Sequence, residues 1–145
     1  GMTNVHKTAI MPYSAEKMFD LVDEIEGYPE FLPWCHSANI QERTKTTVVA
    51  SIEISRMGIH KTFTTRNENQ KPTQITLHFI DGPFKQLNGY WRFESLGENE
   101  GCKIILNIDY EMTGSFLDKA FGAVFHGIAN SLVDAFCERA KQVYA

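Results

Sequence analysis

The sequence predicts an α+β fold in which a curved antiparallel sheet of six to seven strands wraps around one long C-terminal helix, in the order β-α-α-β(5–6)-α. Three observations lead to this prediction. The chain has 145 residues, which suits one domain with a substantial core. Residues 35–112 contain segments in which apolar and polar side chains alternate, as in half-buried strands. From Ser115 onward, apolar residues recur at helical spacing over about 28 residues.

Composition excludes several classes of protein. The three cysteines lie far apart with no CxxC pair, so we expect neither a disulfide framework nor a zinc ribbon. Uninterrupted apolar runs are only a few residues long and no signal peptide opens the chain, so we expect no membrane span. Residues 2–145 are expected to form a single domain, with Gly1 a remnant of a tag. With these classes excluded, we expect a mildly acidic cytoplasmic domain, of formal net charge −4, that does not bind DNA.

The first part of the chain is expected to contain one strand and two helices. Residues 5–10 suit the strand, and Ser14 caps a helix by accepting from backbone N–H groups of the first turn. Apolar residues at helical spacing continue this helix until Gly27. Residues 28–34, an aromatic segment with two prolines, are expected to form a second short helix.

The strands that follow are predicted from alternation and from turn residues. Ile40 ends one strand, and residues 41–45 form its turn. A polar turn is predicted over 67–72. Asn88-Gly89 could form a tight hairpin turn, but this would leave a very short strand before it, so we favour a glycine bulge within one long strand. The other predicted strands contain residues 48–54, 59–65, 75–79, 87–93 and 102–112.

The closing helix begins after Ser115, with Asp118 three positions on as in a capping box. At 1.5 Å per residue it is roughly 42 Å long, enough to cross a whole sheet. An apolar sheet face must be covered, and only this helix is long enough to cover it. Because a curved sheet and a straight helix do not match everywhere, we expect a gap for a ligand between them. The apolar positions of the helix are Leu117, Phe121, Val124, Phe125, Ile128, Leu132, Ala135, Phe136 and Val143.

Four segments together carry a resemblance to a known family. They are Tyr28-Pro29-Glu30-Phe31-Leu32-Pro33-Trp34-Cys35, Phe63-Thr64-Thr65-Arg66, Asp81-Gly82-Pro83-Phe84 through Leu87 to Trp91-Arg92-Phe93, and Ala135-Phe136-Cys137-Glu138-Arg139-Ala140. With these segments in this order, the sequence resembles the coenzyme Q-binding START-type family of the helix-grip, polyketide cyclase/dehydrase superfamily. That family includes mitochondrial quinone chaperones and bacterial ribosome association toxins. The resemblance covers essentially the whole chain.

The resemblance implies a carrier or chaperone that binds ubiquinone or a related polyisoprenoid lipid and supports respiration, with no covalent or metal cofactor. The alternative that it implies is a ribosome association toxin, which binds the large ribosomal subunit and blocks subunit association. A polyketide cyclase or dehydratase is a third interpretation, but no acid–base pair is evident, so we expect no enzyme. We expect transient membrane contact and a cytoplasmic location, with a peripheral position at the inner membrane face as an alternative.

Eight aromatic residues are candidates for the ligand site. Each is either an ordinary core residue or part of a lined cavity, where aromatic faces stack on a benzoquinone ring. Each buried CH₂ group of a ligand contributes about 0.8 kcal/mol. The resemblance favours Trp91 and Phe93 on the sheet and Phe121 and Phe125 on the helix. The eight candidates are Trp34, Phe63, Phe79, Trp91, Phe93, Tyr110, Phe121 and Phe125.

A quinone head group needs hydrogen-bond donors among apolar walls. Tyr110 is the best placed candidate, because it shares a strand face with apolar residues, whereas alternation places Arg92 on the solvent face. His126 and Cys137 are separated by roughly 16 Å along one helix, too far for a nucleophile–base pair. The other histidines show no spacing typical of a metal site. The candidate donors are Arg66, His78, Arg92 and Tyr110.

Charge is distributed unevenly along the chain. Residues 12–34 carry a net charge of −5, and residues 43–71 carry +4. Within the basic segment, Arg56, Lys61 and Arg66 could contact phosphates of ribosomal RNA or of anionic lipid headgroups. A solvated strand face with ordinary basic residues is an equally good interpretation, because the whole chain is acidic.

Overall fold

A computed structural model describes residues 1–145, and the seven-stranded sheet and long C-terminal helix confirm the predicted α+β fold. All neighbouring strands are antiparallel, in the spatial order β1-β7-β6-β5-β4-β3-β2. The elements are β1 (Thr3–Met11), α1 (Ala15–Asp23), the 3-10 helix η1 (Ile25–Glu30), β2 (Cys35–Arg43), β3 (Thr47–Arg56), β4 (Ile59–Gln70), β5 (Gln74–Asp81), β6 (Phe84–Ser95), β7 (Cys102–Met112) and α2 (Phe116–Tyr144).

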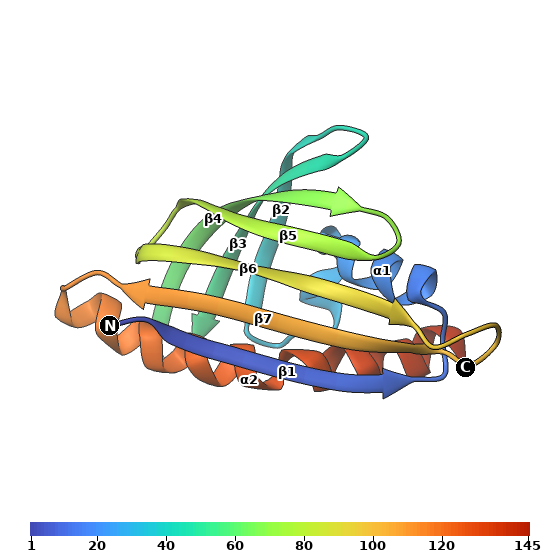
Figure 1. Cartoon of the computed structure of the whole chain (residues 1–145). Helices are drawn as coiled ribbons and strands as arrows, with labels where there is room; N and C mark the ends of the chain where they lie inside the picture. Colours follow the sequence, from blue (N-terminus) through green and yellow to red (C-terminus); the bar gives the residue numbers. More distant parts are fainter.

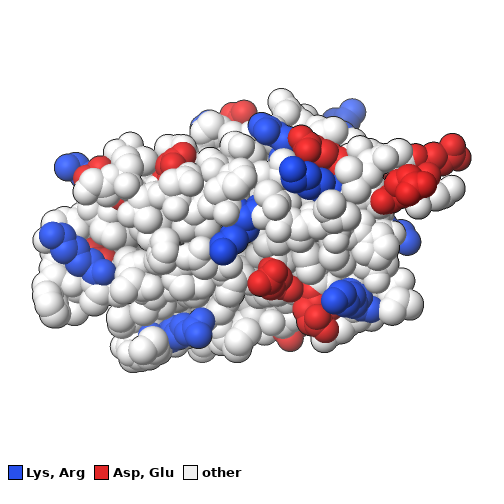
Figure 2. All heavy atoms as spheres, turned by 60° about the horizontal axis from the view of Figure 1, so that its bottom comes forward, with Lys and Arg blue, Asp and Glu red and all other residues white.

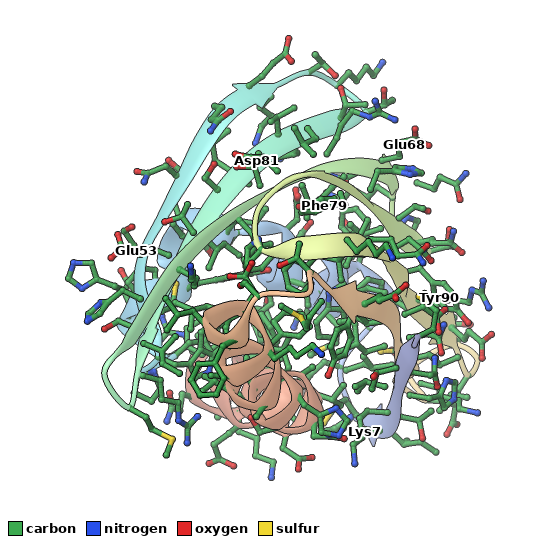
Figure 3. The ribbon with its side chains drawn as sticks, turned by 90° about the vertical axis from the view of Figure 1, so that its left-hand side faces the viewer. Lys7, Glu53, Glu68, Phe79, Asp81 and Tyr90 are labelled. Atoms are coloured by element: carbon green, nitrogen blue, oxygen red, sulfur yellow. The ribbon has the colours of Figure 1, made fainter.

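The sheet curls around α2, which lies along its concave side (Figure 1). Seen along the axis of α2, the strands form an arc on one side of the helix, with Glu53, Glu68 and Tyr90 on the outside of the arc (Figure 3). The helices α1 and η1 close one end of this arrangement (Figure 1). One hydrophobic cluster of 32 buried residues fills the space between sheet and helices.

The helix α2 begins as predicted and buries one stripe of its surface. The Ser115 hydroxyl accepts from the Asp118 backbone N–H at 3.1 Å. Two residues that we placed on the apolar stripe lie outside it, because Leu117 and Val143 are 67% and 49% exposed. They belong to the first and last turns of the helix. The buried residues of α2 are Phe121, Gly122, Phe125, Ile128, Ala129, Val133, Phe136 and Ala140.

Four predicted element boundaries are wrong. The second short helix is η1, which spans Ile25–Glu30 rather than residues 28–34. α1 ends at Asp23 rather than near Gly27, and η1 begins two residues later. The Tyr28 hydroxyl of η1 donates to the Val22 carbonyl of α1, and this bond holds η1 against α1. β2 continues past Ile40 to Arg43, because its pairing with β3 extends to that residue. β4 continues through the predicted polar turn over 67–72 as far as Gln70, because it is paired with strands on both sides.

The long strand that we favoured around Gly89 is confirmed, but the predicted bulge is not at this glycine. Gly89 pairs with Ile108 in regular register, and the shift in register lies between Phe84 and Gln86. A Cβ atom at Gly89 would lie 2.3 Å from the backbone oxygen of Asn107. Glycine is therefore required here by the close approach of β7.

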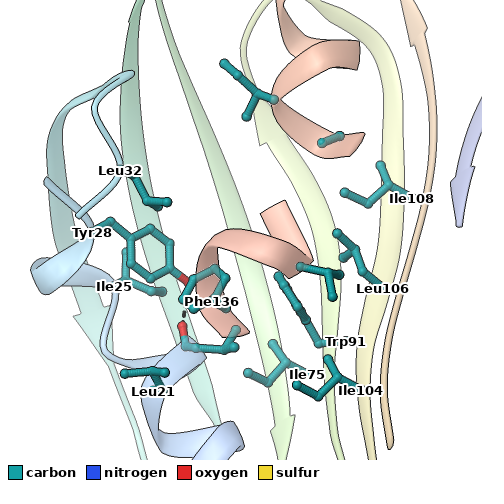
Figure 4. Close-up of a cluster of buried hydrophobic side chains, with 14 of the residues drawn as sticks. Leu21, Ile25, Tyr28, Leu32, Ile75, Trp91, Ile104, Leu106, Ile108 and Phe136 are labelled. Atoms are coloured by element: carbon teal, nitrogen blue, oxygen red, sulfur yellow. Dashed lines mark hydrogen bonds between the residues drawn. The ribbon is translucent and has the colours of Figure 1, made fainter. Parts of the chain in front are cut away.

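The centre of the core is formed by aromatic rings from several elements. Phe136 of α2 is fully buried, and its ring centroid lies 5.3 Å from that of Tyr28 and 5.3 Å from that of Trp91. Both contacts are edge-to-face, an arrangement that aromatic quadrupoles favour. Figure 4 shows Phe136 between these two rings. The segment around Tyr28 is thereby fastened to α2 and to the sheet.

Candidate functional site

An apolar cavity lies between α2, strands of the sheet and the end of α1. Its volume is about 90 Å³, and 17 of its 20 lining residues are hydrophobic. The predicted gap between helix and sheet is therefore present. The lining residues are Val22, Asp23, Ile25, Tyr28, Trp34, Ala50, Ile52, Ile54, Phe63, Thr65, Asn67, Ile75, Leu77, Leu87, Trp91, Ile108, Phe125, Ile128, Ala129 and Leu132.

Four of the eight aromatic candidates line this cavity. Trp34 precedes β2, Phe63 lies on β4, Trp91 on β6 and Phe125 on α2. The rings of Phe63 and Phe125 are 6.0 Å apart and nearly perpendicular. The chain has only two tryptophans, and both belong to this lining.

The other four aromatic candidates lie outside the lining. Phe93 is 1% exposed and packs edge-on against Phe19 of α1, at a centroid distance of 5.7 Å. Phe121 and Phe79 contact Phe84, with centroid distances of 5.9 and 5.8 Å. Phe93 and Phe121 are core residues, and Phe79 is partly buried and packs against the core.

Tyr110, the favoured head-group donor, does not line the cavity either. Its hydroxyl lies 3.0 Å from Nδ1 of His126, on the side of α2 that faces β1 and β7. Partial burial raises the pKa of this hydroxyl. The ring of Tyr110 still packs on Phe125 at 5.0 Å. It therefore supports the cavity wall without reaching the cavity.

The remaining candidate donors also lie outside the lining. Arg66 and His78 both approach Glu68, at 3.4 and 3.5 Å. Arg92 donates to Gln74 at 3.1 Å and lies over the ring of Tyr90.

The polar groups of the lining come instead from residues that the sequence analysis did not single out. Asp23 ends α1, and Thr65 and Asn67 lie on β4 in the same alternating row as Phe63. The Thr65 hydroxyl donates to Asn67 Oδ1 at 2.9 Å. The predicted turn over 67–72 hid this signal, because a strand continued to Gln70 would have shown Asn67 facing the same side as Phe63.

Asp23 is held in place by groups from two strands. Its carboxylate accepts from Arg43 Nη1 at 3.0 Å and from Asn69 Nδ2 at 3.0 Å, and its carbonyl accepts from Arg43 Nη2 at 3.1 Å. These bonds join the end of α1 to the ends of β2 and β4. The cavity consequently has one polar end, which we define as Asp23, Thr65 and Asn67.

The opposite end of the cavity is closed by aromatic side chains. Phe84 lies at its centre, with ring centroids 4.8 Å from Phe125 and 5.7 Å from Phe63. Tyr110 and Phe121 pack on Phe84 at 6.1 and 5.9 Å. We call this group the aromatic end: Phe63, Phe84, Tyr110, Phe121 and Phe125.

Burial raises the pKa of one tyrosine in the lining and of two cysteines elsewhere in the core. Burial raises the pKa of Tyr28, whose hydroxyl donates to a backbone carbonyl. Burial also raises the pKa of Cys35, and that of Cys102, to about 11. No three His, Cys, Asp or Glu residues are grouped as metal ligands.

The three basic candidates do not form one surface. Lys61 pairs with Asp118 at 3.3 Å, whereas Arg66 lies on the other face of β4 and pairs with Glu68. Arg56 is exposed at the end of β3. On the face shown in Figure 2, basic and acidic groups are scattered among neutral residues.

The helix α2 is long and apolar enough to span a membrane by length and composition, with a mean hydropathy of 1.3 over 18 residues. We expected no membrane-spanning helix because uninterrupted apolar runs are short, but a helix can reach this mean hydropathy with polar residues interspersed. In the fold, the buried stripe of α2 packs against the sheet. Burial in the core explains this hydropathy.

The fold and the cavity define the class: a helix-grip protein whose long helix and curved sheet enclose an apolar site. The structure superposes on the Zhui aromatase/cyclase of Streptomyces sp. R1128 with a TM-score of 0.87, at 17% identity, covering 100% of this chain and 97% of that one. The family model described as polyketide cyclase / dehydrase and lipid transport matches residues 11–137. The chain belongs to this family, which confirms the resemblance found in the sequence.

Two relatives of this chain carry different functional names. The ribosome association toxin RatA of Escherichia coli strain K12 is 43% identical over 144 residues, covering 99% of this chain and 90% of that protein. The mitochondrial coenzyme Q-binding protein COQ10 homolog B of Xenopus laevis is 21% identical, covering 95% of this chain and 58% of that protein.

Proposed function

We propose that this protein binds an apolar small molecule between α2 and the sheet, and that the ligand is ubiquinone or a related polyisoprenoid lipid. The observation that carries the proposal is the cavity, whose lining is hydrophobic at 17 of 20 positions. Such a lining gains free energy from every apolar group that it removes from water. A relative named as a coenzyme Q-binding protein supports the choice of ligand. As a carrier, the protein would supply quinone to respiration.

Ligand binding requires the cavity to expand. Its volume of about 90 Å³ is well below the roughly 300 Å³ at which typical small-molecule pockets begin. We propose that this occurs at the aromatic end, where the rings of Phe63 and Phe125 line the cavity and pack edge-on with centroids 6.0 Å apart. We propose that these rings turn aside when the tail of the ligand enters.

We further propose that binding, and not catalysis, is the activity. The ionisable groups of the lining are Asp23 and Tyr28. Asp23 is engaged by Arg43 and Asn69, and the Tyr28 proton is committed to the Val22 carbonyl. Neither group is available as the acid–base pair that a cyclase needs.

Ala129→Leu tests the cavity as the ligand site. Ala129 is 1% exposed and lines the cavity, so an isobutyl group would occupy ligand space. We expect at least a tenfold loss of ubiquinone affinity, measured by quenching of Trp34 and Trp91 fluorescence. Organic extraction and mass spectrometry should also find less co-purified quinone. Ala123→Leu, on the exposed side of the same helix, is the matched control. Equal affinity of both variants for ubiquinone, or no quinone in the wild-type extract and no quenching, would contradict the proposal.

A second candidate function is association with the large ribosomal subunit. It is supported by the name and the 43% identity of the relative from Escherichia coli. Sedimentation with purified large subunits at low salt tests it, and binding through phosphates should weaken as salt rises. Charge reversal of exposed Arg56 should reduce such binding, whereas Lys61 is already paired with Asp118. Absence of co-sedimentation at low salt counts against this function.

We also propose a cytoplasmic protein that contacts the membrane transiently during ligand exchange. Phe116 and Leu117 at the start of α2 are 84% and 67% exposed, and Met57 in the β3–β4 turn is 84% exposed. The Lys61–Asp118 ion pair joins the start of β4 to the start of α2, so these apolar side chains lie at the same end of the molecule. Exposed apolar groups of this kind favour contact with a lipid surface.

A further inference from the structure

The polar end of the cavity provides more hydrogen-bonding capacity than the protein itself uses. Asn67 is 6% exposed, lines the cavity, and its Oδ1 accepts from Thr65 at 2.9 Å. No protein group accepts from its Nδ2. Unlike Asn69 Oδ1 and His78 Nε2, this nitrogen is not sealed from solvent, so it faces accessible space in which a ligand or solvent atom can accept from it. Asn67 therefore marks a position for an acceptor atom inside the cavity.

A second asparagine side chain on β4, that of Asn69, lies close to this polar position. Asn69, one alternating step further along β4, has an Oδ1 atom that is buried and accepts from no donor. Its Nδ2 is committed to the Asp23 carboxylate. Since Asp23 is also fixed by Arg43, the polar end is rigidly connected to α1 and β2.

The two ends of the cavity lie along one strand. Phe63, Thr65 and Asn67 occupy alternate positions of β4 and line the same cavity. At about 3.3 Å per residue, Phe63 and Asn67 are roughly 13 Å apart. A molecule lying along β4 thus meets amide and hydroxyl groups at one end and aromatic rings at the other.

We infer that Asn67 binds the oxygen-bearing head of an amphipathic ligand, and that the apolar tail points along β4 toward Phe63. This inference rests on the proposed function and adds an orientation to it. The ligand class is a ring or short group with a carbonyl or ether oxygen, attached to a hydrocarbon tail. The Asn67 amide donates to that oxygen, while Tyr110 remains outside the site, bonded to His126.

Two ligands that differ only in the head group test the assignment. Decylubiquinone has an oxygenated ring with a ten-carbon tail, and decylbenzene has the same tail on a ring without oxygen. Quinone affinity is measured by quenching of Trp34 and Trp91, both of which line the cavity. Decylbenzene affinity follows from its competition with the quinone.

Asn67→Leu should lower the affinity for decylubiquinone about tenfold, the effect of losing one hydrogen bond inside the cavity. The affinity for decylbenzene should change by less than about twofold. Asn67→Asp, which also removes the donor, should change quinone affinity in the same direction. Asn88→Leu on the exposed face of β6 is the matched control and should leave both ligands unaffected. Near-ultraviolet circular dichroism verifies that each variant is folded.

Three results would overturn the assignment. One is unchanged quinone affinity in both Asn67 variants. Another is an equal loss for both ligands, which would indicate altered cavity shape. The third is a quinone-selective loss in Tyr110→Phe, which would place the head at the aromatic end. In each of these cases the proposed function survives, because the wild-type protein binds quinone; if it binds neither ligand, both proposals fail.

Discussion

The two ends of the cavity are built from different chemistry. At the aromatic end, rings from β4, β6, β7 and α2 pack at centroid distances of 4.8 to 6.1 Å. At the polar end, side chains from α1 and β4 are held by a few directional bonds near 3 Å. Ring packing contributes free energy in proportion to buried area, whereas the polar groups select for matching partners.

This difference predicts that the aromatic end mainly determines stability and the polar end mainly determines ligand selectivity. Substitutions at the aromatic end should mainly change the free energy of unfolding, because many contacts are lost at once. Substitutions at the polar end should cost less stability and change ligand selectivity more. The predictions below compare the two ends, beginning with the largest expected effect.

Phe125→Ala should lower the free energy of unfolding by about 3–5 kcal/mol, the usual cost of removing a buried phenyl ring. Phe125 is 5% exposed, and its ring contacts those of Phe84 and Tyr110 at 4.8 and 5.0 Å. Urea unfolding followed by circular dichroism measures the change. Phe116→Ala on the same helix, at a residue 84% exposed, should change stability by less than about 0.5 kcal/mol. A loss below about 1 kcal/mol for Phe125→Ala would show that the aromatic end does not hold helix and sheet together.

Arg43→Ala should lower the free energy of unfolding by about 1 kcal/mol. It removes both bonds to Asp23, but the pair is partly exposed and solvent screens it. The same variant should lower the affinity for decylubiquinone more than the affinity for decylbenzene, since Asp23 loses its fixed position. Arg66→Ala, which breaks a half-exposed pair with Glu68, is the control and should affect neither stability nor selectivity. Equal behaviour of the two arginine variants would argue against a structured polar end.

The smallest effect concerns pH and the start of α2. The Thr113 hydroxyl, and then Lys61, lower the pKa of Asp118. A carboxyl with a lowered folded pKa stabilises the fold above its unfolded pKa, and this contribution is lost as pH falls through the folded value. Asp118→Asn should therefore lower the unfolding temperature near neutral pH, with the difference from wild type shrinking below about pH 4. Asp134→Asn, an exposed change on the same helix, is the control. A difference that persists at low pH would mean that charge is not its cause.

Alternation and helical spacing predicted most of the fold. β7 alternates along most of its length, with the buried Ile105 as the exception, and α2 has an apolar stripe that continues for many turns. Both patterns arise because one face of each element must be buried. The boundaries near Gly27, Ile40 and Asn67 were wrong, since they depended on pairing and side-chain bonds with segments remote in sequence.

The candidate site was only partly predictable. Trp91 and Phe93 lie on the same face of β6, yet Trp91 lines the cavity and Phe93 packs against Phe19 of α1. Alternation specifies the face of a residue but not which helix covers that part of the strand. Similarly, Tyr110 faces inward as expected, but its hydroxyl reaches His126 beside the cavity.

The local pattern of apolar residues was sufficient to specify a long helix gripped by a curved sheet, because periodicity follows directly from backbone geometry. The position of the cavity depended on where a straight helix departs from that sheet, and the polar end depended on the meeting of Asp23, Arg43 and Asn69 from three separate elements. Such convergence has no local signature, since hydrogen bonds between distant segments form only once the chain has folded.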